Sequence, residues 1–286
     1  MSHAIIIPIY CENRNTINLC NELQNFGAEH IVVVNDGLNP KSEYFNELTS
    51  IGCHLVHLKN NNGKGASLKA GIKYAHDNLY NITGYITCDA DGQHTANDVM
   101  KISRMLDLRN GSLILGKRDY KKSKMPINIR IGNRLSSAYF KVITGKSCRD
   151  TQTGLRGIPA FLYDTVMKTK GSRFDFEMNF LTKCADMRVP FYFVNIIADC
   201  SNCSSNFRLI KDTYLIYRTP LRFATASIGC TIIDLVLFTI FAYILPSHMF
   251  FNIMLATLMA RVVSGGINFL INRKVIFGNT DNGAKQ

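Results

Sequence analysis

Several features are scarce in this sequence, and each scarcity excludes a class of protein. Only seven of the 286 residues are proline, and the twenty glycines follow no repeating period, which excludes collagen-like and low-complexity chains. Hydrophobic residues make up 47% of the chain, which is ordinary for a protein with a packed core. The length favours about two domains of roughly 150 residues each.

The N-terminus lacks the features of a secretory leader. No Lys or Arg precedes the first apolar run, residues 4–7, and Pro8 interrupts that run. We therefore expect the polar part of the chain to stay in the cytosol. The nine cysteines have no repeated spacing, so buried free thiols are expected. One CxxC pair, Cys200 and Cys203, has no second ligand pair nearby to complete a zinc site.

Acidic residues are outnumbered, with 21 against 33 basic residues, and the formal net charge is +12. Such a charge suits nucleic acid, a membrane surface or an acidic small-molecule substrate. The sequence contains neither an aromatic-basic strand signature nor paired zinc-finger ligands. We therefore expect no nucleic-acid partner. A membrane surface or a phosphate-bearing substrate is favoured instead.

Short apolar runs alternate with stretches of helical spacing in the first part of the chain. The runs are residues 4–7, 31–34, 54–58, 85–88 and 113–115. This alternation predicts an α/β domain with a mostly parallel sheet, because strands covered on both faces are apolar throughout. In such sheets ligands bind beyond the carboxyl ends of the strands, so the polar residues after each run are the expected functional ones.

The polar segments after the fourth and third runs carry the chemistry. In extended backbone, Asp89, Asp91 and Gln93 lie on one side of the chain, and such oxygen donors suit Mg²⁺ or Mn²⁺ with a diphosphate. A solvated acidic turn is the alternative. Residues 62–65 open a helical stretch, where glycines, a helix N-terminus and Lys64 can hold a phosphate. A flexible turn before a helix is the alternative there.

Residues 127–144 predict a basic amphipathic helix. Arg130, Arg134 and Lys141 lie together on the face that adjoins an apolar stripe. The stripe consists of Ile127, Ile131, Leu135, Ala138 and Val142. The helix is either an ordinary domain helix or an interfacial helix that attracts phosphate head groups of a bilayer.

Two long apolar stretches, each with a single charged residue, occur near the C-terminus. Residues 223–245 and 249–271 each extend about 34 Å as a helix, enough for a hydrocarbon core of about 30 Å. They predict two transmembrane helices, preceded by an amphipathic juxtamembrane segment at 207–222. Lys and Arg flank this hairpin and are absent from its link, so the positive-inside rule places both ends in the cytosol.

Two charged residues interrupt the predicted hairpin. Asp234 lies eleven residues after Phe223, and Arg261 lies eleven before Asn272, so the two reach similar depth. An isolated charge at mid-membrane costs at least about 2.5–3.5 kcal/mol on insertion scales, and we therefore expect the two to pair. A site for a phosphate or sugar during transport is the alternative.

The motifs taken together resemble glycosyltransferase family 2, in its polyprenyl-phosphate (dolichyl-phosphate-like) branch. The similarity rests on PIYCE at 8–12, VNDG at 34–37, NNNGKG at 60–65, DADGQH at 89–94, GKR at 116–118, DTQTGLR at 150–156 and FDFE at 174–177. The C-terminal part is similar to a truncated GtrA-like membrane segment, with two spans where that family usually has four.

The resemblance implies a GT-A (Rossmann-like) fold and a domain organisation. Residues 1–206 would form a cytosolic glycosyltransferase domain, followed by the juxtamembrane segment at 207–222. Residues 223–272 would hold the two membrane helices, and 273–286 a cytosolic tail. The implied protein is a multi-pass protein of the cell membrane.

The implied reaction moves a sugar from a nucleotide-diphosphate sugar to polyprenyl (undecaprenyl) phosphate with inversion, and gives a lipid-linked sugar for cell-envelope glycan decoration. Cys11, Asn35 and Leu38 depart from the common family residues in the nucleoside pocket, and we favour UDP over GDP. The implied metal is Mg²⁺ or Mn²⁺. Other implied partners are the lipid bilayer, a second copy in a homo-oligomer and a separate flippase.

Site residues carried over by motif fall into four groups. The nucleotide would be bound by Pro8, Tyr10, Glu12, Asp36, Lys64 and Asp89, and the metal by Asp89, Asp91 and Gln93. The catalytic group is Asp91, Asp150 and Arg118, with Asp150 near the reacting carbon as a base or an organiser. The acceptor phosphate would be held by Arg130, Arg134 and Arg208, and Arg118 is a further candidate for gripping phosphate.

Two other functions compete with this interpretation. The first is a membrane transporter or assembly subunit whose cytosolic domain binds nucleotide sugar without turnover. The second is a polymer-extending synthase of the same superfamily, which would need further spans and usually a Gln-x-x-Arg-Trp motif. The sequence contains no tryptophan, which disfavours the synthase.

Overall fold

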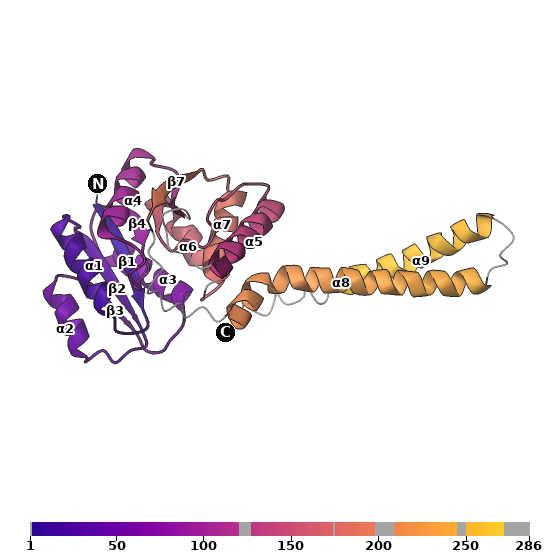
Figure 1. Ribbon diagram of the computed structural model, residues 1–286, viewed down its shortest axis with the longest axis horizontal. Helices are drawn as coiled ribbons and strands as arrows, with labels where there is room; N and C mark the ends of the chain where they lie inside the picture. The colour runs from indigo at the N-terminus through magenta and orange to yellow at the C-terminus, as the bar shows by residue number, and fades with distance from the viewer. Residues whose placement is uncertain (1, 120–126, 174, 198–208, 245–249, 272–286) are drawn as a thin grey trace. The chain divides into compact units, whose positions relative to one another are not determined.

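The computed structural model describes residues 2–119, 127–173, 175–197, 209–244 and 250–271 (Figure 1). These residues belong to two compact units, Met1–Arg208 and Leu209–Gln286. The predicted link at 246–248, the tail at 273–286 and the CxxC pair lie outside the described residues.

A seven-stranded sheet forms the centre of the first unit, with the strand order β3-β2-β1-β4-β6-β5-β7. Its strands are β1 (Ser2–Ile9), β2 (His30–Asp36), β3 (His54–Leu58), β4 (Ile82–Thr87), β5 (Leu113–Arg118), β6 (Arg156–Pro159) and β7 (Phe191–Ile196). β6 runs antiparallel between β4 and β5, and the other pairings of the sheet are parallel. The sheet confirms the prediction of an α/β domain with a mostly parallel sheet.

Helices cover both faces of this sheet (Figure 1). They are α1 (Arg14–Asn25), α2 (Glu43–Ser50), α3 (Lys64–Asn78), α4 (Ala96–Leu108), α5 (Ile127–Thr144), the 3-10 helix η1 (Ala160–Leu162), α6 (Tyr163–Lys168) and α7 (Asp175–Asp186). Successive β1 residues point to opposite faces, so Ile5 packs with α1, α2 and α4, and Ile6 packs with α3, α6 and α7. The sheet is therefore buried on both sides, as its apolar strands predict.

α5 has the predicted bounds but presents its faces in an unusual way. Four residues of its apolar stripe are 51% to 84% exposed: Ile127, Ile131, Leu135 and Val142. Its polar residues Asn133 and Ser136 are buried instead and bind Thr151, with 2.8 Å between the Ser136 and Thr151 hydroxyl oxygens. The helix is thus fixed to the first unit by hydrogen bonds, and its apolar stripe faces outward.

The second unit contains α8 (Leu209–Ile244) and α9 (Phe250–Ile271). α9 packs on α8 through small residues spaced by four, Ala256, Ala260 and Ser264, each at most 8% exposed. Among the described residues, one helical stretch, Ser227–Ile244, is long and apolar enough to cross a membrane, with a mean hydropathy of 2.0. The apolar stretch described in α9, Asn252–Ile267, is shorter, so a second span is not confirmed.

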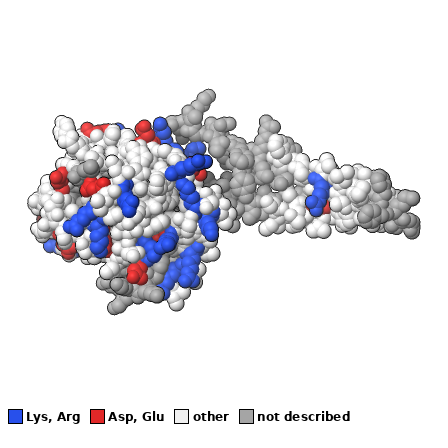
Figure 2. All heavy atoms as spheres, turned by 90° about the horizontal axis from the view of Figure 1, so that it is seen from above, with Lys and Arg blue, Asp and Glu red and all other residues white. Residues whose placement is uncertain are grey.

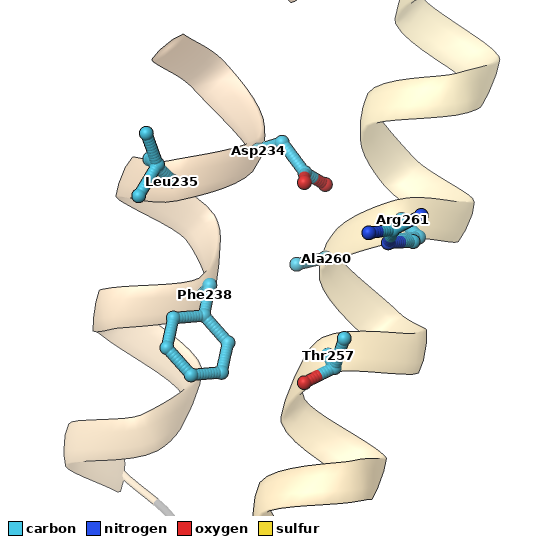
Figure 3. Close-up of a pocket in the computed structure, with 6 residues that line it drawn as sticks. All are labelled: Asp234, Leu235, Phe238, Thr257, Ala260 and Arg261. Carbon is cyan, nitrogen blue, oxygen red and sulfur yellow. The ribbon is translucent and has the colours of Figure 1, made fainter. Parts of the chain in front are cut away.

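The predicted ion pair between Asp234 and Arg261 is wrong. The Ser264 hydroxyl donates a hydrogen bond to Asp234 Oδ1 at 2.7 Å, and no ion pair of the described residues joins Asp234 to Arg261. Figure 3 shows Asp234 extending from α8 toward α9, while Arg261 does not extend across to α8. The helix turn explains this, since Arg261 lies about 100° around α9 from Ala260, which faces α8.

Candidate active site

A buried charge cluster lies beyond the carboxyl end of β4. Lys64 Nζ lies 2.6 Å from Asp89 Oδ1 and 3.2 Å from Glu177 Oε1. Burial alone would lower the pKa of Lys64, but the two carboxylates outweigh burial and raise the pKa above its usual range. Lys64 therefore stays charged and connects the start of α3 to the segment after β4 and to α7.

The loop before Lys64 is held in place by Asp36, at the end of β2. The buried Asp36 carboxylate accepts hydrogen bonds from the backbone N–H of Asn62 at 2.8 Å and of Gly63 at 2.9 Å. Gly63 has a φ of +93°, which glycine adopts without strain. Asp36 thus positions Lys64 through the loop, and the nucleoside contact expected of Asp36 stays a prediction.

Asp89 is enclosed by three different segments. Besides Lys64, His94 Nε2 lies 3.6 Å from Asp89 Oδ2. Burial raises the pKa of Asp89, but Lys64 and His94 overcome burial and lower the pKa well below its usual range. A Cβ atom at Gly154 would overlap the Asp89 carboxylate, so the close approach of the DTQTG segment requires glycine there.

Asp91 and Gln93 form the outer part of the same segment. The Gln93 side-chain amide donates to Asp91 Oδ2, and the Gln93 backbone N–H donates to Asp91 Oδ1 at 3.1 Å. Burial and the neighbouring negative charge of Asp89 raise the pKa of Asp91. These three residues form one acidic site on a bent segment, not on the expected extended backbone, and their role as metal ligands stays a prediction.

This acidic site fits a hard divalent cation. Two carboxylates that disfavour each other's ionisation would be relieved by a divalent positive charge, and carboxylate and amide oxygens suit Mg²⁺ or Mn²⁺. The residues described include no group of three His, Cys, Asp or Glu arranged for a metal. Asp89, Asp91 and Gln93 would supply only part of the coordination shell of such a cation.

Arg118 and Asp150 bind each other. Arg118 Nε and one Nη each donate to the Asp150 carboxylate at 2.7 Å, and both side chains are at most 7% exposed. The sequence predicts Arg118 as a phosphate ligand and Asp150 as the acid beside the reacting carbon. The structure uses the pair to fasten the end of β5 to the DTQTG segment, so both catalytic roles stay predictions.

Arg156, in β6, is a site residue that the sequence marks only as part of a motif. Its guanidinium is 2% exposed and donates to the backbone carbonyl oxygens of Thr151, Thr153 and Glu177. Its Nη2 also lies 3.8 Å from Glu177 Oε1. Arg156 therefore orients the carboxylate that binds Lys64.

The end of β1 and the residues after it border the acidic site. Pro8 is buried, Glu12 is exposed, and Tyr10 is 37% exposed. Burial raises the pKa of Tyr10 to about 12, with smaller contributions from Cys11 and from the carboxylates of Asp91 and Asp89. The Tyr10 phenol therefore lies within electrostatic range of the acidic site and stays protonated at neutral pH.

Two of the three residues predicted to bind the acceptor phosphate lie in the described part of the chain. Arg130 and Arg134 lie on α5, which Asn133 and Ser136 attach to Thr151 of the DTQTG segment. Arg130 is half-buried and Arg134 is exposed. Arg208 lies outside the described residues, so its position relative to the site stays a prediction.

Several proteins are similar to this chain in amino-acid sequence. An uncharacterised protein of Methanocaldococcus jannaschii is 32% identical over 188 residues, which cover 62% of this chain and 73% of that protein. The UDP-N-acetylglucosamine–dolichyl-phosphate N-acetylglucosaminyltransferase of Methanococcus voltae is 29% identical, with 53% of this chain and 67% of that protein covered. Glycosyltransferase AglJ of Haloferax volcanii is 26% identical, with coverages of 64% and 58%.

Solved structures share the fold. Glucosyl-3-phosphoglycerate synthase of Mycobacterium tuberculosis in complex with UDP matches with a TM-score of 0.58 at 12% identity, over 76% of this chain and 79% of that chain. Its complex with Mn²⁺, UDP-glucose and phosphoglyceric acid matches with a TM-score of 0.57 at 11% identity, with the same coverages. At such low identity these likenesses show a GT-A-like fold.

The family is shown by the sequence itself. The model of the family "Glycosyl transferase family 2" matches residues 4–164, more than half of the chain. This range includes β1 to β6 and the acidic site after β4. The chain belongs to glycosyltransferase family 2 and is a glycosyltransferase.

Proposed function

We propose that this chain is a membrane-bound inverting glycosyltransferase that moves a sugar from a UDP-sugar to polyprenyl (undecaprenyl) phosphate. The product would be a lipid-linked sugar for cell-envelope glycan decoration. The observation that carries the proposal is the acidic site of Asp89, Asp91 and Gln93, set against the half-buried Lys64. The printed name of the Methanococcus voltae relative, with a UDP-sugar donor and a dolichyl-phosphate acceptor, supports the same substrate classes.

The donor would bind beyond the carboxyl ends of β1, β2 and β4. Asp89, Asp91 and Gln93 would hold Mg²⁺ or Mn²⁺, which supplies positive charge to the departing diphosphate when it is bound. Lys64 balances the charge of Asp89 and keeps that carboxylate ionised and ready for a cation. Pro8, Tyr10, Glu12 and Asp36 would surround the nucleoside, and the complexes of the structural neighbour with Mn²⁺ and UDP-glucose are consistent with this donor.

The acceptor needs placement more than activation. A phosphate monoester has a second pKa of about 6 and is largely ionised at neutral pH, so it needs little help from a base. Arg130 and Arg134 on α5, together with Arg208, would hold it by forked hydrogen bonds. The buried pairing of Asp150 with Arg118 favours the role of an organiser for Asp150 over that of a base.

A bilayer would lie against the outward face of α5. The exposed apolar stripe of α5 and its neighbouring Arg134 match the composition of an interfacial helix. We propose two membrane spans, 223–245 and 249–271, preceded by the juxtamembrane segment at 207–222. The glycosyltransferase domain, 1–206, and both termini would lie in the cytosol, because Lys and Arg flank the spans.

One assay tests this function directly. Membranes that contain the full chain are incubated with polyprenyl phosphate, Mg²⁺ or Mn²⁺ and a panel of labelled nucleotide sugars, and label that enters the organic phase is measured. We expect transfer from a UDP-sugar, and a loss on the order of 10²–10³-fold for Asp91→Ala. The control is Asp77→Ala, an exposed acid at the end of α3.

Two outcomes would contradict the proposal. If no donor labels the lipid with either metal, the chain is not a polyprenyl-phosphate glycosyltransferase. If the wild-type chain binds a nucleotide sugar but turns over none of it, and Asp91→Ala changes nothing in metal-dependent release of nucleoside diphosphate, the binding subunit of a transporter or assembly is the better description.

A further inference from the structure

The second unit contains two charged side chains that share one cleft without pairing. The cleft has a volume of about 250 Å³ and lies between α8 and α9 (Figure 3). Its lining consists of Asp234, Leu235, Phe238, Thr257, Ala260 and Arg261. Asp234 accepts one hydrogen bond, from Ser264, and Arg261 is exposed. Both charges therefore open onto the same side of the helix pair.

The surroundings of this cleft are apolar. Apart from Asp234 and Arg261, residues 227–244 of α8 and 250–271 of α9 carry no formal charge, and Figure 2 shows this part white except for one blue and red spot. A second, apolar cleft of about 420 Å³ adjoins Arg261 and is lined by Ile253, Met254, Thr257 and Leu258. An unpaired guanidinium on such a surface is expensive inside a bilayer, so it needs an acidic partner from outside the helix pair.

A second copy of the same chain supplies that partner by symmetry. When two helix pairs face each other across a twofold axis parallel to the helices, α8 of one copy lies opposite α9 of the other. Asp234 and Arg261 line the same cleft, and Asp234 binds Ser264, which lies three residues, about 4.5 Å, along α9 from Arg261. A rotation about such an axis keeps height, and the long arginine side chain can bridge this offset, so each carboxylate meets a guanidinium of the other copy.

We propose that two copies of this chain associate through this face, with Asp234 of one copy bound to Arg261 of the partner subunit and the reciprocal pair formed at the same time. The two ion pairs leave no uncompensated charge between the helices, and the apolar cleft beside Arg261 is covered by the opposing helices. The association rests on the proposed membrane location of α8 and α9. It concerns a surface outside the glycosyltransferase site.

Charge exchange between two differently tagged chains tests the proposal. Asp234→Arg places two positive charges on this face, and Arg261→Asp places two negative charges on it. Each variant is first expressed alone in two differently tagged forms, and the membranes are solubilised with mild detergent. The two forms of one variant should co-purify at least tenfold less than the two forms of the wild-type chain do. Co-expression of the Asp234→Arg chain with the Arg261→Asp chain should restore co-purification, because both reciprocal ion pairs form again.

Restoration between two singly substituted chains is the decisive result. Pairing within one chain cannot produce it, because each of these chains carries only one sign of charge at the two positions. A wild-type chain that is monomeric in membranes would overturn the proposal, and so would failed restoration when both variants resist carbonate extraction from the membrane. If one variant is not inserted, Asp234→Asn and Arg261→Gln replace the pair, and co-purification equal to wild type would overturn the proposal.

Transfer of labelled sugar is measured on the same membranes. Association without transfer by the wild-type chain would contradict the proposed function and leave the association standing. Transfer of labelled sugar by a monomeric chain would support the proposed function and contradict the association.

Discussion

Charged side chains have different surroundings in the two units of this protein. In the first unit, Lys64, Arg118 and Arg156 each bind groups from other segments of the chain, because a sheet covered on two faces surrounds a side chain on all sides. In the second unit, Asp234 and Arg261 share a cleft without pairing, because two helices leave an outer surface. The difference indicates that charges organise a site in the first unit and face outward in the second.

The largest effect is expected from breaking the Arg118–Asp150 pair. Arg118→Met leaves the Asp150 carboxylate buried and unpaired, which should cost about 3–5 kcal/mol of the free energy of unfolding. Thermal unfolding of the full chain in detergent, followed by circular dichroism, measures this loss. The double variant Arg118→Met with Asp150→Leu should recover most of it, and a loss below about 1 kcal/mol in the single variant would contradict a buried structural pair.

A somewhat smaller effect is expected for Lys64. Lys64→Gln removes the positive charge that Asp89 and Glu177 share, so transfer of labelled sugar should fall on the order of 10²-fold. Lys73→Gln, on the same helix, is the matched control, because its ion pair with Asp77 is exposed to solvent. Equal activity of the two variants would show that the buried charge cluster is not part of the site.

The sequence predicts most of the sheet because strands that are buried on both faces consist of continuous apolar runs. Each of the five apolar runs contributes to a strand, and α5 has the bounds that its periodicity predicts. The predicted runs miss two strands, β6 and β7, and β6 has the sequence Arg-Gly-Ile-Pro, whose arginine and proline are unlike a buried strand. Arg156 can be buried there because three backbone carbonyl oxygens bind it, and no local pattern reveals those distant partners.

The sequence likewise predicts the part of the candidate site that follows from local patterns. The position of Asp89, Asp91 and Gln93 after a strand follows from the carboxyl-end rule for parallel sheets. The mutual pairing of Arg118 with Asp150 does not follow, because it joins β5 to a loop thirty-two residues later. In the second unit, counting residues gives a position along each helix but not the direction around it, which is why Ser264 and not Arg261 meets Asp234.

A third test concerns the outward face of α5. Leu135→Ser removes an exposed apolar side chain of the stripe, so the stability should be unchanged while the KM for the lipid acceptor rises up to about tenfold. The control is Leu108→Ser on α4, where an exposed leucine lies outside this stripe. A fall in the melting temperature without a change in KM would assign the stripe to packing and not to the bilayer.

The smallest effect concerns His3, at the start of β1 and therefore at the opposite edge of the sheet from the acidic site. The ring is 4% exposed, its Nδ1 lies 2.8 Å from Ser103 Oγ and its Nε2 lies 3.3 Å from Asp107. Burial lowers the pKa of His3 below 6.5, although Asp107 opposes the shift. The unfolded chain then binds a proton more readily than the folded chain, so stability rises with pH across this range.

This stabilising contribution is therefore complete above pH 6.5 and is lost as the pH falls toward the lower pKa of the folded state. His3→Gln should reduce the loss of melting temperature between neutral and mildly acidic pH, and the exposed His76→Gln should leave that loss unchanged. Transfer activity at neutral pH should stay the same in both variants, because neither side chain belongs to the acidic site. A His3→Gln chain that loses activity at neutral pH would instead connect this edge of the sheet to catalysis, and the separation between structural and catalytic charges in the first unit would no longer hold.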